Sequence, residues 1–278
     1  MPSNVYTHGH HESVLRSHRW RTAENSAAYL LPVLNGDMRV LDVGAGPATI
    51  TRDLAARVAH VTALEVTEEA VGVARDGLAG IGNAEVVLGD VHALPFPDDT
   101  FCVVHAHQVL QHVADPVLAL REMHRVCKPG GYVAARDSDY AGFVWYPRVP
   151  ELDDWMALYQ RMARANGGEP DAGRRLLAWA REAGFAEVTA TSNTWCFADD
   201  EDRAWWGGMW ADRVRTSAMA RQALDAGVPQ EELDRLADGW RRWAADGDGW
   251  LSILHGEILA RPTARSSARP TVADGFRA

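Results

Sequence analysis

Two closely spaced glycines form the clearest chemical motif of the chain. Gly44 and Gly46 follow residues 39–43, which read Arg-Val-Leu-Asp-Val and predict a buried strand. A glycine turn lets a ligand approach the backbone, because no side chain blocks it. Residues 49–58 carry apolar side chains at helical spacing, so the turn lies at a helix N-terminus, where N–H groups favour electron-rich ligand groups. The motif therefore predicts a nucleotide-containing ligand.

A carboxylate ends the next apolar run. Glu65 follows residues 60–64 and lies about 20 positions after Gly44. At this spacing an acidic side chain on the neighbouring strand reaches the ribose hydroxyls of a dinucleotide. The third glycine of the dinucleotide motif is replaced, because Thr49 stands three positions after Gly46. An oxidoreductase that uses NAD(P), which has the same type of turn, is therefore the weaker alternative.

Histidines gather at the end of a later apolar run. His105, His107 and His112 lie in and after residues 101–106, which predict a strand. Open α/β sheets place ligands at the carboxyl ends of their strands, and imidazole titrates near neutral pH. His107, nearer the strand tip, is therefore the first candidate for a catalytic base or a contact to the substrate. A structural role is its alternative, and it is the role expected for His112.

Other catalytic candidates lie farther from this motif. Asp139 follows the fifth predicted strand and could meet a substrate, with a capping role as the alternative. His10 and His11 precede residues 13–34, which carry apolar side chains at helical spacing and predict a helix that serves as a lid. Arg21 in that helix is a candidate contact to cofactor or substrate. The histidines have no carboxylate or cysteine partner at a convincing spacing, so no metal site is predicted.

Strands and helices must alternate to position these residues. The first half of the chain predicts strands at 39–43, 60–64, 84–88, 101–106 and 132–136, with helices at 49–58, 67–79 and 116–127. Thr67 and Asp115 are the expected N-caps of the last two helices, since their side chains can accept from free N–H groups. This alternation predicts an α/β fold with a doubly wound parallel sheet.

The second half of the chain is richer in helix and tryptophan. Helices are predicted at 151–166 and 174–183, and strands at 186–197 and 250–259. Seven of the eleven tryptophans lie in the last third: Trp195, Trp205, Trp206, Trp210, Trp240, Trp243 and Trp250. Packing of a helical cap is their expected role, and lining of an apolar or aromatic pocket is the alternative.

These patterns divide the chain into five segments. They are an N-terminal lid at 1–37, a core at 38–198 with a helical insertion at about 141–173, a tryptophan-rich helical cap at 199–248, a final core strand at 249–262 and a flexible tail at 263–278. The tail is polar and too weakly apolar to offset the entropy of ordering it.

The composition of the chain argues against some classes of binding partner. A net charge of −10 argues against binding to nucleic acid, whose partners usually carry a basic face. The chain lacks a long apolar run and a signal-peptide pattern, so we expect a cytoplasmic protein that does not enter the membrane. Cys102, Cys127 and Cys196 fit neither a disulfide framework nor a zinc site and are expected to be reduced core thiols.

Four motifs together resemble the class I S-adenosylmethionine-dependent methyltransferases. They are Leu-Asp-Val-Gly-Ala-Gly at 41–46, Glu65, Gly-Asp-Val-His-Ala-Leu-Pro-Phe at 89–96 and Arg-Val-Cys-Lys-Pro-Gly-Gly at 125–131. Within that family the chain is similar to the small-molecule branch that includes the quinone-ring methylating enzymes. The resemblance covers about residues 38–137. It implies a seven-stranded Rossmann-like sheet whose last strand is antiparallel.

The resemblance also implies the roles of matching residues. Gly44 and Gly46 would approach the methionine part of the cofactor, Glu65 would bind ribose, and Asp90 and Val91 would flank the adenine. Asp42 would orient the glycine loop. The cofactor-binding residues are therefore expected to be Asp42, Gly44, Ala45, Gly46, Glu65, Val66, Asp90, Val91, His107 and Arg21.

The activity implied is methyl transfer by in-line displacement. The methyl group would pass from S-adenosylmethionine to an O, N or C atom of an apolar or aromatic small molecule, leaving S-adenosylhomocysteine. Such a reaction needs mainly a positioned acceptor and the exclusion of water. A cofactor-binding protein of this fold without methyl transfer is the alternative. The expected partner is the small-molecule acceptor, with a homodimer possible.

Overall fold

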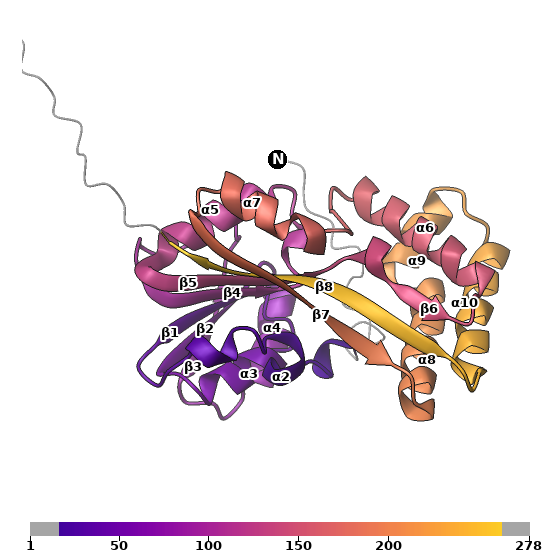
Figure 1. Ribbon diagram of the computed structural model, residues 1–278, viewed down its shortest axis with the longest axis horizontal. Helices are drawn as coiled ribbons and strands as arrows, with labels where there is room; N and C mark the ends of the chain where they lie inside the picture. The colour runs from indigo at the N-terminus through magenta and orange to yellow at the C-terminus, as the bar shows by residue number, and fades with distance from the viewer. Residues whose placement is uncertain (1–16, 263–278) are drawn as a thin grey trace, which may run out of the picture.

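A single mixed sheet forms the centre of the computed structural model, which describes residues 17–262 (Figure 1). The strand order is β3-β2-β1-β4-β5-β8-β6, and β7 pairs with β8. Strands β1 to β5 run parallel, whereas β8 is antiparallel to β5, β6 and β7. The bounds are β1 Arg39–Val43, β2 His60–Glu65, β3 Ala84–Leu88, β4 Phe101–His107, β5 Cys127–Ser138, β6 Val144–Tyr146, β7 Glu187–Phe197 and β8 Trp250–Arg261.

This topology confirms the predicted doubly wound sheet with an antiparallel last strand. The strand that differs is β6, a three-residue strand that pairs with the beginning of β8. It makes the described sheet eight-stranded and lies inside the range 141–173, for which only a helical insertion was predicted. Three residues are too few to show the alternation of apolar and polar side chains by which a strand is recognised.

Helices cover both faces of the sheet (Figure 1). One face carries α2 (Ala23–Ser26), α3 (Thr49–Ala55) and α4 (Glu68–Gly77), and the other carries α5 (Pro116–Val126) and α7 (Leu176–Glu182). The predicted N-caps are confirmed, because the side chains of Thr67 and Asp115 accept hydrogen bonds from the third residue beyond each. Separate apolar clusters lie on the two faces, so the sheet is buried on both sides.

The single helix predicted over 13–34 was wrong in its described part. Residues 17–19 are helical, but the chain breaks before α2 and continues into a 3-10 helix at Leu31–Val33. Thr22 causes the break, since its side chain accepts from the N–H of Asn25 and the Asn25 side chain accepts from the N–H of Thr22. This capping box starts a new helix.

The Lys-Pro-Gly-Gly sequence at 128–131 also differs from the prediction. It ends α5 as expected, but it belongs to the first part of β5 rather than to a turn before the strand. The pairing of β4 with β5 is irregular here, between Phe101 and Val103. A Cβ atom on Gly131 would lie 2.4 Å from the Cys102 carbonyl oxygen, so a glycine is required for the strands to approach.

Four further helices pack together beyond the end of the parallel strands (Figure 1). They are α6 (Pro150–Ala165), α8 (Asp200–Thr216), α9 (Ala218–Asp225) and α10 (Gln230–Ala245). Trp155 lies at the centre of this helical layer, edge-on to Trp210 at 4.6 Å and to Trp240 at 4.8 Å between ring centroids. Burying each such ring contributes roughly 2 to 3 kcal/mol, so the tryptophans supply a separate core for the layer.

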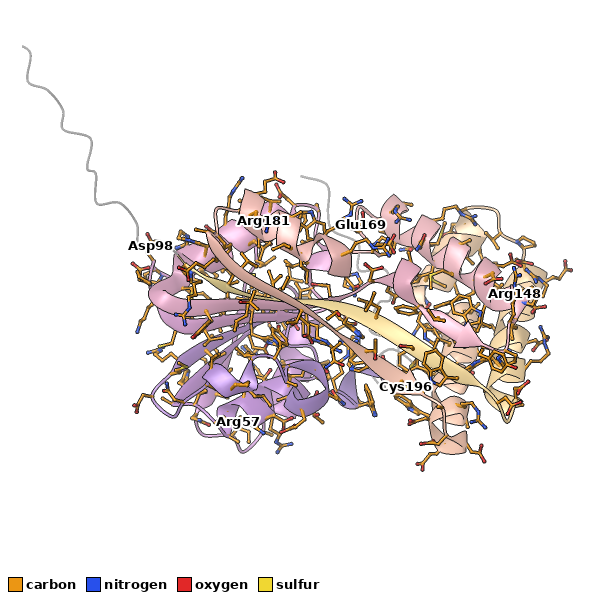
Figure 2. All side chains as sticks on the ribbon, viewed as in Figure 1. Arg57, Asp98, Arg148, Glu169, Arg181 and Cys196 are labelled. Atoms are coloured by element: carbon orange, nitrogen blue, oxygen red, sulfur yellow. The ribbon has the colours of Figure 1, made fainter. Side chains whose placement is uncertain are left out.

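The position of Cys196 differs from the expectation that the three cysteines are core thiols. Cys196 lies exposed on β7 rather than in the core (Figure 2). It lies between Trp195 and Phe197, which are buried, so its own side chain points to the opposite face of the strand, toward solvent. Cys127 is buried, as expected. Among residues 17–262, no helix combines the length and apolarity needed to cross a membrane.

Candidate active site

A cavity of about 950 Å³ lies at the carboxyl ends of the parallel strands. Its volume is near the upper end of the range for ligand pockets, so it has room for a cofactor and a second small molecule. The structure brings all ten predicted cofactor-binding residues to its wall: Arg21, Asp42, Gly44, Ala45, Gly46, Glu65, Val66, Asp90, Val91 and His107.

The glycine turn has a backbone conformation that residues with a side chain rarely adopt. Gly44 and Gly46 have φ of +68° and +57°, in the left-handed region. A Cβ atom on Gly44 would lie 2.5 Å from Cγ2 of Val109. The N–H of Gly46 donates to Oε1 of Glu65 at 2.5 Å, so the carboxylate at the end of β2 is held against the turn. The two predicted motifs therefore form one unit.

Asp42 is buried beneath this unit and supports it. One carboxylate oxygen lies 2.8 Å from Nδ1 of His105, and the other accepts from the Thr51 hydroxyl at 2.6 Å. These contacts tie β1 to β4 and to α3. His105 is itself fully buried and does not line the cavity, whereas His107 does. Asp42 thus links the strand that precedes the glycine turn to its neighbours.

Asp90 lies on the cavity wall after β3 and is half exposed. Its Oδ1 atom accepts from the backbone N–H of His92 at 2.9 Å and lies 2.7 Å from the His92 ring. This is an Asx turn, in which an aspartate stabilises its own loop. Both of these contacts use Oδ1, so they leave the second carboxylate oxygen, Oδ2, for a ligand. Val91 beside it is buried and apolar.

His107 is almost wholly buried on the cavity wall. Neither ring nitrogen has a hydrogen-bond partner within residues 17–262. Burial, followed by the charges of Arg21 and Arg136, lowers the pKa of His107 well below its usual value. The ring is therefore neutral near pH 7. An imidazole whose protonated form is disfavoured in this way is a weak general base, so the structure favours a contact role over the predicted role as base.

His112, a partly exposed residue on the cavity wall, offers a test of whether the histidines of the site are neutral. Burial, with a smaller effect of Arg21, lowers its pKa to about 3. In the unfolded chain it binds a proton below about pH 6.5, so the stability it contributes is present above that pH and is lost as the pH falls. The free energy of unfolding should therefore decrease between pH 6 and pH 4. We expect His112→Gln to reduce the slope of this decrease by up to about 1.4 kcal/mol per pH unit.

Urea denaturation at several pH values measures this slope. His60→Gln is the matched control, because this partly exposed ring begins β2 beside Glu85 and does not line the cavity. Equal slopes for wild type and His112→Gln would contradict the assignment of a neutral His112.

Aromatic side chains line the other end of the cavity. Trp195 comes from β7, Trp206 and Trp210 from α8, and Tyr140 and Phe143 from the segment after β5. Trp240 and Trp243 do not line the cavity and pack in the helical layer instead. Both expectations for the tryptophans therefore hold, each for different rings. The sequence pattern missed Tyr140 and Phe143, which lie in an irregular segment without a motif.

Guanidinium groups lie over two of these aromatic rings, Trp210 and Trp195. The Arg213 guanidinium carbon is 4.6 Å from the centre of the Trp210 ring, and that of Arg21 is 5.7 Å from the Trp195 ring. Cations over aromatic faces are favourable. The acids on the wall, by contrast, lie in or after β1, β2 and β3 or cap α5; they are Asp42, Glu65, Asp90 and Asp115.

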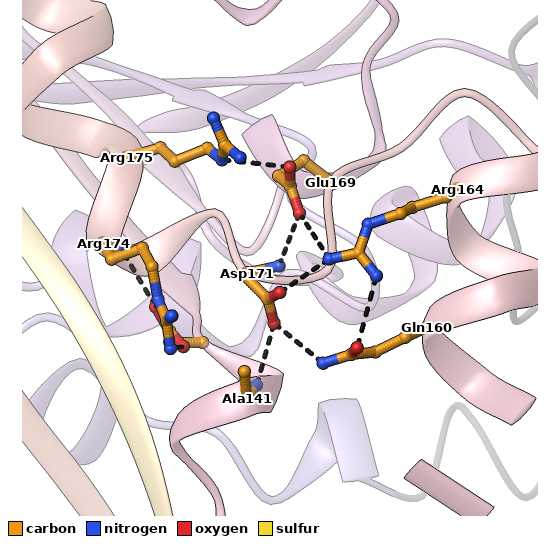
Figure 3. Close-up of polar contacts among 8 residues, drawn as sticks. Ala141, Gln160, Arg164, Glu169, Asp171, Arg174 and Arg175 are labelled. Carbon is orange, nitrogen blue, oxygen red and sulfur yellow. Dashed lines mark hydrogen bonds and ion pairs between the residues drawn. The ribbon is translucent and has the colours of Figure 1, made fainter. Parts of the chain in front are cut away.

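Asp139, the remaining catalytic candidate among the described residues, does not line this cavity. Asp139 is buried outside it, and both of its carboxylate oxygens accept from Arg174 at 2.5 and 2.6 Å (Figure 3). It lines a smaller cavity of about 240 Å³ instead. Its carboxylate is therefore held in an ion pair rather than presented to the main cavity. His10 and His11 lie outside the described residues. Within those residues, no cluster of side chains could hold a metal ion.

Comparison with known proteins agrees with this geometry. A family model described as a methyltransferase domain matches residues 41–135. An uncharacterized methyltransferase of Schizosaccharomyces pombe is 37% identical over 268 residues, which cover 91% of this chain and 95% of the relative. A demethylmenaquinone methyltransferase of Clavibacter sepedonicus is 33% identical over 63% of this chain and 75% of its own length.

A solved structure shares the fold. The putative methyltransferase BH2331 of Bacillus halodurans matches with a TM-score of 0.54 and 26% identity, covering 85% of this chain and 98% of its own. The matched region holds the glycine turn, Glu65 and Asp90, which line one cavity here. The chain therefore belongs to the class I S-adenosylmethionine-dependent methyltransferases, and S-adenosylmethionine is its cofactor.

Proposed function

We propose that this protein transfers the methyl group of S-adenosylmethionine to an O, N or C atom of an apolar or aromatic small molecule. One observation carries the proposal: a single cavity of about 950 Å³, near the upper end of the range for ligand pockets, is lined both by the glycine turn and by a cluster of aromatic side chains. The cofactor occupies the glycine end. The acceptor occupies the aromatic end, among Trp195, Trp206 and Trp210.

The cofactor is held by the residues around the glycine turn. Backbone at Gly44 and Gly46 approaches the methionine part, Glu65 accepts from the ribose hydroxyls, and Asp90 and Val91 bind the adenine amine and ring. Arg21 pairs with the methionine carboxylate. Support comes from charge, because the acids on the wall lie at this end and the sulfonium is a cation.

The transfer needs positioning more than acid–base catalysis. When bound, S-adenosylmethionine would supply an electrophilic methyl group; an electron pair of the acceptor would form the new bond to this methyl carbon as the C–S bond breaks, leaving neutral S-adenosylhomocysteine. The proton of an O or N acceptor then passes to solvent. His107 touches the acceptor or the methyl group as a neutral ring, since its pKa is held well below the usual value. The aromatic walls exclude water.

A matched acceptor panel tests the proposal. Naphthols and hydroxybenzoates are compared with aliphatic alcohols and amines of similar size, with formation of S-adenosylhomocysteine measured by mass spectrometry. We expect turnover of at least one aromatic acceptor about tenfold or more above its aliphatic partner. Equal turnover, or turnover of aliphatic compounds alone, would contradict the aromatic assignment.

A pair of tryptophan variants locates the acceptor. Trp206→Ala enlarges the aromatic end and should raise the acceptor KM while leaving cofactor affinity unchanged. Trp205→Ala is the control, because this neighbouring ring does not line the cavity.

We further propose that the substrate is a small molecule and that the protein is cytoplasmic. The acidic composition argues against nucleic acid, and a cavity of about 950 Å³ lies in the range for small-molecule ligands.

A further inference from the structure

We propose that Gln108 and His255 are positioning residues that hold the Arg21 guanidinium at the cavity, where it pairs with the methionine carboxylate of the cofactor. The inference rests on the proposed role of Arg21. Neither Gln108 nor His255 belongs to the sequence motifs of the site. Gln108 follows β4, and His255 lies in β8, far from it in sequence.

A directed chain of hydrogen bonds connects β8 to Arg21. Nδ1 of His255 lies 3.1 Å from the Ile253 carbonyl oxygen, which can only accept, so this nitrogen carries the proton. In the neutral ring, Nε2 is then an acceptor, and the Gln108 amide nitrogen donates to it at 3.0 Å. The Gln108 amide oxygen in turn accepts from Nη2 of Arg21 at 2.8 Å.

Each member of the chain has a single orientation that satisfies it. The carbonyl of Ile253 fixes the tautomer of His255, the tautomer fixes the amide of Gln108, and the amide presents its oxygen to the guanidinium. The protonated form of His255 would break the chain, because both nitrogens would then be donors. Burial, followed by the charges of Arg136 and Arg21, lowers the pKa of His255 well below its usual value and keeps the ring neutral.

The backbone of Gln108 shows that its position is constrained. Its φ is +55°, in the left-handed region that a residue with a side chain rarely adopts. The N–H of Gln108 donates to the Arg136 carbonyl oxygen at 2.7 Å, which holds the residue in this conformation. Strained residues of this kind persist where the surrounding structure holds them, often beside ligands. Here the strain directs the amide toward both His255 and Arg21.

The ring of His255 is equally constrained. It is fully buried, and its centre lies 4.3 Å from that of Trp195 and 6.4 Å from that of His107, which stacks on it. Trp195 also lies beneath the Arg21 guanidinium. The chain of hydrogen bonds and the aromatic stack therefore end at the same side chain from two directions.

Arg21 needs such support because of its place in the fold. It lies between the helical residues 17–19 and α2, in a segment outside the sheet, and its side chain has many rotamers. A guanidinium that is already oriented loses less entropy when it binds a carboxylate. The two positioning residues thus convert a flexible side chain into a fixed contact.

Two ligands that differ in the amino-acid part separate this role from a structural one. S-adenosylhomocysteine carries the carboxylate, whereas 5′-methylthioadenosine lacks the whole amino-acid part. Calorimetric titration of both ligands is carried out on wild type, Arg21→Met, Gln108→Leu, His255→Phe and Gln230→Leu. Gln230 begins α10, remote from the cavity, and serves as the control.

We expect Arg21→Met and Gln108→Leu to weaken S-adenosylhomocysteine about tenfold and His255→Phe to weaken it about threefold or more. The affinity for 5′-methylthioadenosine should stay within about twofold in all variants, and Gln230→Leu should match wild type. Gln108→Glu keeps an oxygen acceptor for Arg21 but has no N–H to donate to His255, so it should weaken S-adenosylhomocysteine about threefold or more, as His255→Phe does. It also serves as the readout if Gln108→Leu does not fold.

The outcomes separate the role of Arg21 in binding from the role of Gln108 and His255 in positioning it. If Arg21→Met binds S-adenosylhomocysteine like wild type, the proposed role of Arg21 in the site is wrong. If Arg21→Met loses affinity but Gln108→Leu and His255→Phe do not, the positioning chain is overturned while the site remains. An equal loss for both ligands in Gln108→Leu and His255→Phe would show that these residues act on the fold and would also overturn it.

Discussion

Gly44→Ala is expected to weaken S-adenosylmethionine binding by about 30-fold to 5000-fold. The left-handed backbone costs an alanine roughly 1 to 2 kcal/mol. The new Cβ atom would also lie 2.5 Å from Cγ2 of Val109, and overpacking of this kind costs roughly 1 to 3 kcal/mol. The turn can relieve both only by moving away from the position that receives the methionine part. Calorimetric titration measures the affinity.

Gly36→Ala is the matched control for this variant. No heavy atom lies within 4 Å of the added Cβ, and the residue does not have a positive φ. Its cofactor affinity and melting temperature should match wild type. A Gly44→Ala variant that binds S-adenosylmethionine like wild type would show that the turn does not contact the cofactor.

Gly256→Ala is expected to lower the free energy of unfolding by about 3 kcal/mol or more. Gly256 lies in the middle of β8, between β5 and β7. A Cβ atom there would lie 2.0 Å from the carbonyl oxygen of Gly173, which is backbone and cannot rotate away. The 3-10 helix at Gly173–Arg175 must therefore lift off the sheet, or β8 must shift from its partners.

Urea denaturation of Gly256→Ala and Gly247→Ala measures this effect. Gly247 lies in the loop before β8 and has open space where the methyl group of an alanine would lie, so its substitution should change stability by less than about 0.5 kcal/mol. Similar stability of the two variants would mean that the contact between Gly173 and Gly256 relaxes easily.

The parallel half of the sheet could be predicted from sequence because its signals are local. Strand β3 has the predicted bounds, and β1 and β2 follow the predicted apolar runs. The N-caps Thr67 and Asp115 were found for the same reason, since a cap acts within three residues. The glycine turn and Glu65 are brought together by adjacent strands, so their joint position also follows from local order.

Elements that depend on distant partners could not be predicted in this way. The three residues of β6 form a strand because the beginning of β8 lies beside them. Asp139 looked available for a substrate because nothing near it in sequence shows that Arg174 binds it. Gln108 and His255 meet only through the pairing of β8 with β5, which the chain completes after more than a hundred intervening residues.

Strand β8 also has a consequence for the order in which the molecule is made. It pairs with β5, β6 and β7, yet it is the last strand of the described chain. Contacts of such long sequence separation form late and slow folding. During synthesis the edges of β5 and β7 must wait unpaired until β8 leaves the ribosome. A nascent chain that stalls before Trp250 would therefore expose open strand edges, which are prone to aggregate and are a natural target for chaperones.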